Sequence, residues 1–269
     1  MLSPETPESE PVCIVQLTDS HLYADQRSDL LGLDTCASLN AVIDQVLEEN
    51  QRMDLVLATG DITQDGSAGG YQRFMQSVAR LPAPCHWIPG NHDNAQLMAR
   101  MGEENGLSRD WVDLGNWRIV LLDSSLPGAV AGHLAASQFE LLDLAIASAG
   151  ERFVMVCLHH HPVAIGCDWM DPLGLLNAAA LWPRLAGERV RVLLWGHVHQ
   201  EYDQMRDQLR MLATPSTCIQ FAAESEDFAT DTQAPGYRWL HLYADGKVET
   251  GVSRLAQGRF LPDPGATGY

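Results

Sequence analysis

Five short polar clusters follow apolar, strand-like runs of the chain, and each holds residue types that bind metal ions in proteins. They are "TDSH" (18–21), "GD" (60–61), "GNHD" (90–93), "HHHP" (159–162) and "GHVH" (196–199). In open α/β sheets, ligands bind in the crevice beyond the carboxyl ends of the strands, so five strands can direct their clusters to one place. The sequence therefore predicts one shared polar site.

The candidate ligands in these clusters offer oxygen and nitrogen donors without a thiolate. They are Asp19, His21, Asp61, Asn91, one histidine of 159–161, His197 and His199. Such a set is too large for a single four-coordinate zinc site. It suits two divalent ions that share a carboxylate, and it favours Fe, Mn, Zn or Co over Ca. Two ions roughly 3.5–4 Å apart are the usual device for attacking a phosphoester with metal-bound hydroxide.

Spacing within two clusters indicates paired ligands. Asp19 and His21 are separated by one residue, and so are His197 and His199. In an extended chain, residues i and i+2 share a face. Each pair is therefore predicted to supply two ligands from one backbone segment.

The run of three histidines poses a choice of ligand. An extended backbone directs His160 to one face and directs His159 and His161 to the other. The flanking pair has the appearance of a His-x-His ligand motif. Alternation alone leaves the choice between His160 and this pair open.

Composition and charge narrow the classes of partner. The 269 residues are 46% hydrophobic, and 35 acidic against 17 basic residues give a net charge of −18. This balance argues against nucleic acid or an anionic membrane as a partner. A small anionic substrate stays compatible with it, because bound metal ions reverse the sign of the charge locally.

Several absences in the sequence favour a cytoplasmic protein. No apolar run approaches the roughly 20 residues that span a bilayer, and residues 1–11 lack the features of a signal peptide. The six cysteines show no C-x-x-C spacing and are expected to be reduced thiols. The oligomeric state, monomer or homodimer, is left open.

Strand-like and helix-like segments alternate up to residue 195, and the last third is rich in strands. Strands are predicted at 12–18, 54–59, 85–89, 117–123, 152–159 and 189–195, and helices at 34–50, 67–80, from about 94, 137–149 and 175–186, with Asp34 or Thr35 as the cap of the first. This order predicts two packed sheets with helices outside, in one domain over residues 12–254. Residues 1–11 and 255–269 are expected to form tails, with disorder over 1–11 and over 257–269.

All five clusters, in their order, resemble the signature of the calcineurin-like metallophosphoesterases: D-x-H, G-D, G-N-H-[DE], H-x-P and G-H-x-H. The blocks "GLDTCASLNAVID", "HHHPVAIGCDWMD" and "PSTCIQFAAESEDFATDTQAPGYRWLHL" are similar to the bacterial class III 3′,5′-cyclic AMP phosphodiesterases. The first resemblance covers residues 18–199 and the second covers roughly 12–254. Together they imply a four-layer α/β/β/α sandwich around a dinuclear metal centre.

The resemblance also implies an assignment of ligands. One ion is expected on Asp19, His21, Asp61 and His199, and the other on Asp61, Asn91, His160 and His197, with Asp61 shared. The H-x-P register selects His160, which leaves His159 in a structural role. The ions implied by relatives are Fe with Mn, or Mn alone.

The implied reaction is hydrolysis of cyclic AMP to 5′-AMP, with a bridging hydroxide as the nucleophile. Substrate contacts are expected from His21, Asn91, His92 and His199, with His92 protonating the departing ribose oxygen and Asp93 fixing the His92 tautomer. Trp169 and Tyr23 are candidates for stacking on adenine, although packing is the commoner role. The alternatives are the same fold acting on cyclic GMP, a glycerophosphodiester or a phosphomonoester, and a non-catalytic interaction scaffold.

Overall fold

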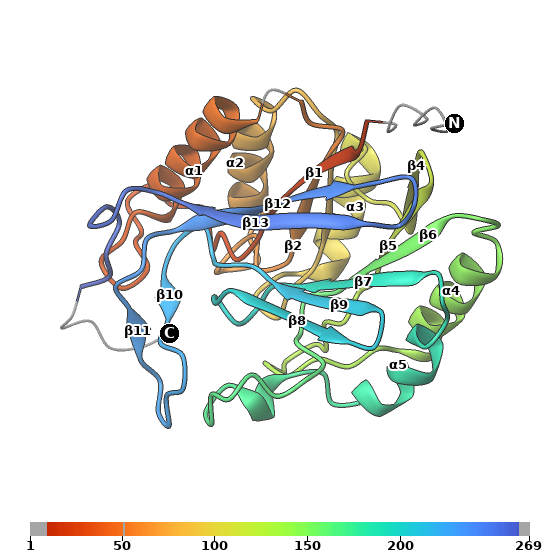
Figure 1. Ribbon diagram of the computed structural model, residues 1–269. Helices are drawn as coiled ribbons and strands as arrows, with labels where there is room; N and C mark the ends of the chain where they lie inside the picture. The colour runs from red at the N-terminus through yellow and green to blue at the C-terminus, as the bar shows by residue number, and fades with distance from the viewer. Residues whose placement is uncertain (1–9, 51, 264–269) are drawn as a thin grey trace, which may run out of the picture.

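The computed structural model describes residues 10–50 and 52–263, which form two mixed β-sheets packed against each other (Figure 1). Of the expected tails, residues 1–9 and 264–269 lie outside the described residues. In the part of the chain that is described, no helix has the length and apolar character needed to cross a membrane.

The first sheet has five strands in the order β13-β12-β1-β2-β3. These strands are β1 (Val12–Leu17), β2 (Leu55–Thr59), β3 (Cys85–Ile88), β12 (Gly236–Leu242) and β13 (Val248–Arg254). β1, β2 and β3 are parallel, while β12 is antiparallel to both of its neighbours. Two strands from late in the chain, β12 and β13, therefore extend the sheet formed by β1, β2 and β3.

The second sheet has six strands in the order β4-β5-β6-β7-β9-β8. These strands are β4 (Trp111–Leu114), β5 (Trp117–Leu121), β6 (Phe153–Cys157), β7 (Val190–Trp195), β8 (Tyr202–Arg206) and β9 (Leu209–Ala213). β5, β6, β7 and β9 are parallel, and the two edge strands are antiparallel. A separate short ladder joins β10 (Gln220–Phe221) to β11 (Thr230–Asp231).

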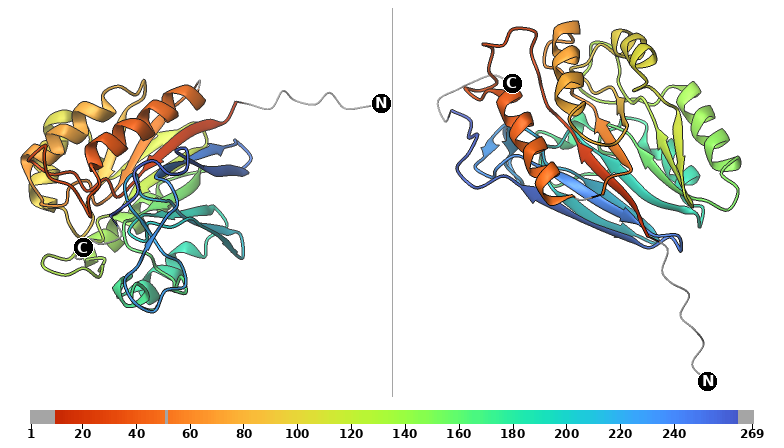
Figure 2. Two further views of the ribbon diagram at one scale, coloured as in Figure 1. Left: turned by 90° about the vertical axis from the view of Figure 1, so that its left-hand side faces the viewer. Right: turned by 90° about the horizontal axis from the view of Figure 1, so that it is seen from above.

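Helices cover the outer face of each sheet, as the views from the side and from above show (Figure 2). The helices are α1 (Thr35–Glu49), α2 (Ala68–Val78) and α3 (Ala95–Asn105) on the first sheet, and α4 (Ala136–Ala147) and α5 (Ala178–Leu185) on the second, with a 3₁₀ turn η1 (Asp171–Leu173). This arrangement confirms the predicted α/β/β/α sandwich. The predicted cap is also present, because the Asp34 carboxylate accepts a hydrogen bond from the Ala37 backbone N–H at 2.9 Å.

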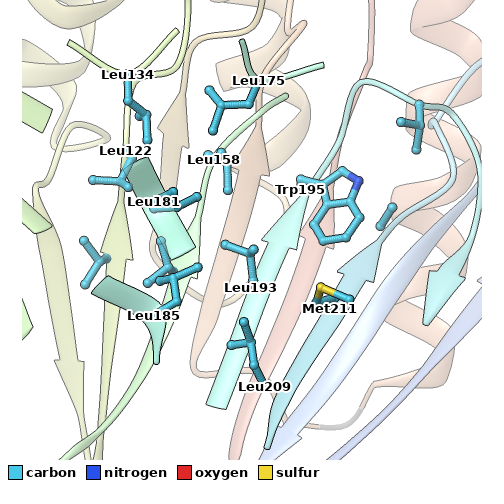
Figure 3. Packing of buried hydrophobic residues seen from close by; sticks show 14 of the residues in the cluster. Leu122, Leu134, Leu158, Leu175, Leu181, Leu185, Leu193, Trp195, Leu209 and Met211 are labelled. Carbon is cyan, nitrogen blue, oxygen red and sulfur yellow. The ribbon is translucent and has the colours of Figure 1, made fainter. Parts of the chain in front are cut away.

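Three layers of apolar side chains hold the sandwich together. The central layer lies between the sheets and includes Ile14, Trp117 and Leu194. The layer under α4 and α5 includes Leu181 and Trp195 (Figure 3). Burial of this apolar area is the main driving force for the fold, and it fixes the two sheets relative to each other.

Residues 255–263 pack on the domain, in contrast to the tail that was expected there. Leu255 is buried, and its backbone N–H donates to the Pro235 carbonyl at 2.8 Å. The Asp263 N–H donates to the Leu31 carbonyl at 2.7 Å. The described packing therefore extends past the expected boundary of the domain.

Candidate metal centre

The polar clusters converge where β1, β2, β3, β6 and β7 end, as the order of the parallel strands requires. The ligand atoms of Asp19, His21 and His199 lie within 4.8 Å of one another, and so do those of Asp19, Asp61 and His159. All five side chains are almost fully buried. The structure thus brings the predicted pairs, Asp19 with His21 and His197 with His199, into one region.

Asp61 joins the two groups of donors. Its Oδ2 lies 3.3 Å from Nε2 of His159 and 3.8 Å from Nε2 of His21. Its Oδ1 accepts a hydrogen bond from the backbone N–H of His92 at 2.9 Å. Burial by itself raises the pKa of Asp61, but the nearby histidines, His159 foremost, reverse this and hold the pKa well below its usual value. Asp61 is therefore an ionised carboxylate placed between two sets of imidazoles, as expected of a shared ligand.

His21 and His199 face each other through nitrogen lone pairs. The Nδ1–H of His21 donates to Gln64 Oε1 at 2.6 Å, and the Nδ1–H of His199 donates to the Ile219 carbonyl at 2.8 Å. Each ring then has its lone pair on Nε2, and these two atoms are 3.1 Å apart. Two nitrogens at this distance share a proton in a hydrogen bond, and a metal ion can take the place of that proton.

His159 has the same arrangement on the opposite side of Asp61. Its Nδ1–H donates to the Thr59 carbonyl at 2.7 Å, so Nε2 faces Asp61 and also lies 3.3 Å from Asn91 Oδ1. Burial alone lowers the pKa of His159, but Asp61 reverses the effect and raises the pKa to about 9. The position therefore attracts positive charge. This placement differs from the structural role expected for His159.

His160 points away from the carboxylates. The Ser124 hydroxyl already accepts hydrogen bonds from the backbone N–H groups of His159 and His160, so its single proton is donated to His160 Nδ1 at 2.8 Å. The Nε2–H of His160 then donates to the Val130 carbonyl at 3.0 Å. Both ring nitrogens are thereby used within the protein. The ligand atom of His160 nevertheless lies in one group with those of His159 and His197, so the choice of ligand within the histidine run stays a prediction.

His197 lies next to this histidine pair. Its Nε2–H donates to the Leu173 carbonyl at 3.1 Å, which leaves the lone pair on Nδ1. Its backbone N–H donates to both carboxylate oxygens of Asp19, each at 3.1 Å. His197 therefore supplies a nitrogen donor and also orients a carboxylate of the neighbouring group.

The backbone of the site is not extended. Five predicted ligands have positive φ angles in the left-handed region: Asp19 (55°), His21 (48°), Asp61 (49°), His197 (69°) and His199 (50°). Non-glycine residues adopt this region rarely, and clusters of such strain occur at functional sites. The members of each predicted pair lie close together because the chain turns sharply after the strands, and not because an extended chain alternates its faces.

Gly90 allows two of these turns to approach each other closely. A Cβ atom at this position would lie 2.1 Å from Asp61 Oδ1 and 2.4 Å from the Asp61 backbone nitrogen. No side chain fits at that distance. The glycine of the G-N-H-D cluster is therefore required for the position of Asp61.

Asp93 holds two loops together. Its Oδ2 accepts hydrogen bonds from the backbone N–H groups of Gly90 (2.9 Å) and Ile62 (3.1 Å). Its Oδ1 accepts from the Thr63 N–H and the Tyr71 hydroxyl, both at 3.1 Å. These contacts tie the carboxylate to the loops that carry Asp61 and His92, and its predicted action on the His92 tautomer stays a prediction.

His92 lies at the mouth of the centre, with its ring 5.0 Å from that of His21 in an edge-to-face arrangement. Its ligand atom falls in one group with those of His21 and Asp61. It is less buried than His21 and Asp61. This position suits contact with a bound molecule.

Some residues of the site carry no signal in the sequence. Ser124 and Gln64 orient histidines by hydrogen bonds, and the Phe221 ring stacks on His199 with centroids 4.1 Å apart. Trp169, considered for stacking on adenine, instead packs edge-on against Phe221 at 5.1 Å. Tyr23, the second candidate, is partly buried against the core.

The donor set as a whole fits divalent cations. Imidazole nitrogens, two carboxylates and an amide oxygen surround the volume on both sides of Asp61, and no thiolate is among them. Fe, Mn, Zn and Co accept this mixture. The arrangement can therefore hold two ions that share Asp61 and can bind an anion on its open side.

Comparisons with known proteins agree with this geometry. A model of the calcineurin-like phosphoesterase family matches residues 14–201. The chain is similar to the 3′,5′-cyclic adenosine monophosphate phosphodiesterase CpdA of Pseudomonas aeruginosa, with 54% identity over 259 residues that cover 96% of this chain and 95% of that protein. It is also similar to CpdA of Escherichia coli (strain K12), with 44% identity over 261 residues and the same coverage of 96% and 95%.

Among solved structures, a dimetal phosphatase from Danio rerio has a similar fold. The TM-score is 0.64 at 17% identity, and the match covers 92% of this chain and 100% of that chain. This likeness supports the architecture of the sandwich.

Proposed function

The chain belongs to the calcineurin-like phosphoesterase family, and from this premise we propose that it hydrolyses 3′,5′-cyclic AMP to 5′-AMP. The observation that carries the proposal is the pair of donor groups joined at Asp61, in a chain 54% identical to a cyclic AMP phosphodiesterase over nearly its whole length. In a cell, this reaction lowers the concentration of cyclic AMP.

We propose that two divalent ions, Fe or Mn, are held with His159 in place of His160. One ion would be held by Asp19, His21, Asp61 and His199, and the other by Asp61, Asn91, His159 and His197. When bound, such ions polarise a phosphoester and lower the pKa of water. The support for His159 is the direction of its Nε2 toward Asp61 and Asn91, while the nitrogens of His160 contact Ser124 and Val130.

The protein's own groups orient the ester and supply a proton. Asn91 and His92 line a cavity beside the centre, where they can contact the phosphate oxygens. Hydrolysis breaks the bond between phosphorus and the 3′ oxygen, and this oxygen needs a proton as it leaves. We assign that proton to the His92 imidazole, because His92 follows Asn91 at the open edge of the centre.

Asp93 acts indirectly in this scheme. It fixes the loop that carries Asn91 and His92 through its hydrogen bonds to Gly90, Ile62 and Thr63. Its contribution is the position of the neighbouring side chains and not the transfer of a proton.

The test is metal content measured beside hydrolysis of cyclic AMP, cyclic GMP and a small diester, methyl p-nitrophenyl phosphate. We expect two ions per chain and a kcat/KM for cyclic AMP above that for the other two, with 5′-AMP as the product by chromatography. A preference for the small diester would contradict the substrate assignment. A purified chain that binds no metal and hydrolyses nothing would point to an interaction scaffold.

A further inference from the structure

A cavity of about 410 Å³ opens beside the metal centre. Asn91 and His92 form its inner end, and Asp65, Asn94, Ser125 and Leu126 line its walls. Its volume is within the usual range for small-molecule sites, roughly 300–1,000 Å³. A substrate whose phosphate contacts Asn91 and His92 would extend into this space.

One wall of the cavity belongs to a closed surface loop, residues 124–133. The loop is closed by a hydrogen bond from the His133 N–H to the Ser124 carbonyl at 2.9 Å. A second bond, from the Ala129 N–H to the Leu126 carbonyl at 3.0 Å, turns the chain inside the loop. Compact loops of this kind have adjacent ends and are packed by side chains that fill their interior.

His160 is the side chain that fills this loop. Its ring accepts from Ser124 at one end and donates to the Val130 carbonyl at the other, at 2.8 and 3.0 Å. Gly132 lies flat against the ring, where an added Cβ would be 2.3 Å from His160 Cγ. The ring is fully buried although the loop is at the surface. His160 therefore fixes the course of the wall.

The lining of the cavity matches an uncharged ring system with polar edges. Leu126 is 38% exposed, which is high for a large apolar side chain next to a polar site, and Pro127 adjoins it. Asn94 and Asp65, with an amide and a carboxylate, are also among the lining residues. This carboxylate disfavours a second phosphate but can accept hydrogen bonds from an amino group or a ribose hydroxyl.

We propose that this cavity receives the nucleoside part of the cyclic nucleotide, and that His160 is a positioning residue that holds its wall. The proposal rests on the proposed function, since it concerns the substrate of the same centre. The base lies against Leu126 and Pro127, and the phosphate faces Asn91 and His92. His160 acts on the substrate only through the loop.

The first test fills the cavity. Leu126→Trp should raise KM for cyclic AMP by about tenfold, which corresponds to ~1.4 kcal/mol of lost binding, and should affect methyl p-nitrophenyl phosphate much less. The matched control is Leu144→Trp, because Leu144 is a 57% exposed leucine on α4, outside the cavity. It should leave both KM values unchanged. An unchanged KM for cyclic AMP in Leu126→Trp, or equal losses for both esters, would overturn the proposal.

The second test removes the support of the loop. His160→Ala should retain two ions per chain and raise KM for cyclic AMP by about tenfold, with a smaller change in kcat. His160→Gln should recover part of the loss, since its amide N–H can donate to the Val130 carbonyl. Loss of an ion in His160→Ala would show that His160 is a ligand and would overturn the positioning role.

The parent protein separates this proposal from the proposed function. If the metal-loaded parent hydrolyses methyl p-nitrophenyl phosphate but not cyclic AMP, the function is wrong. If the parent prefers cyclic AMP and the Leu126→Trp variant retains that preference, only the cavity assignment is wrong.

Discussion

The two sheets contribute different chemistry to the centre. The five-stranded sheet supplies both carboxylates, Asp19 and Asp61, from the turns after β1 and β2. The six-stranded sheet supplies only imidazoles, from His159 after β6 and the histidines after β7. The negative charge that attracts cations is thus on one sheet, and imidazole donors oriented by hydrogen bonds are on the other.

The direction of the donor atoms depends on neighbouring groups more strongly for the imidazoles than for the carboxylates. An ionised carboxylate has lone pairs on both oxygens and no tautomer, so its donor atoms do not depend on where a proton lies. An imidazole has a single lone pair when neutral, and a hydrogen bond to the other nitrogen decides where that lone pair points. The imidazole side of the centre is therefore set by partners such as the Thr59, Leu173 and Ile219 carbonyls.

The shared carboxylate is the most severe test of the carboxylate side. Asp61→Asn keeps the shape but removes the charge between the two donor groups. We expect metal content to fall for both ions and kcat/KM to drop by at least about 10⁴-fold, or ~5.4 kcal/mol. Asp44→Asn, at a 59% exposed carboxylate on α1, is the control. Two ions retained in Asp61→Asn would show that the groups bind independently.

His92→Ala tests the proton donor on the five-stranded side. Because His92 is assigned to the leaving oxygen and not to the ions, kcat should fall by roughly 10²–10⁴-fold with metal content unchanged. The comparison is made by single-turnover kinetics and metal analysis on one preparation. Unchanged turnover would remove this role from His92.

The histidine run tests the imidazole side. His159→Ala should lose one ion and lower activity by at least about 100-fold. Loss of a residue that only orients a metal ligand typically costs roughly 10- to 100-fold, so loss of a ligand should cost at least as much. His160→Ala is its matched partner and should keep both ions. The reverse outcome would restore the H-x-P register and refute the tautomer argument.

Tyr71→Phe removes a hydroxyl that holds Asp93 in the five-stranded half of the site, and it should have the smallest effect of these substitutions. The Tyr71 hydroxyl donates to Asp93 and accepts from the Asn94 N–H at 2.8 Å, so removing it leaves that part-buried N–H without this partner. We expect the free energy of unfolding to fall by about 1–2 kcal/mol in urea denaturation. A loss of kcat as large as that of His92→Ala would indicate that Asp93 takes part in the chemistry.

Much of the fold followed from local patterns. Short apolar runs that end in polar clusters predicted the parallel strands, and the cap at Asp34 predicted the start of α1. Local patterns do not predict how the strands of the last third are arranged, because these strands divide between the two sheets. Long-range pairing, such as that of Val15 with Trp239, decides which strand joins which sheet. Such pairings join residues that are distant in sequence and leave little local trace.

By itself, the sequence determined the chemistry of this protein: the oxygen and nitrogen donors, their order, and their placement at the ends of strands. The tertiary structure alone decided which histidine faces Asp61 and which one fills the 124–133 loop. Alternation assumes an extended backbone, but the turns at the site are left-handed at residues such as Asp19 and His197. A ring then points where its hydrogen-bond partners hold it, and those partners, Ser124, Val130 and Thr59, come from other parts of the chain.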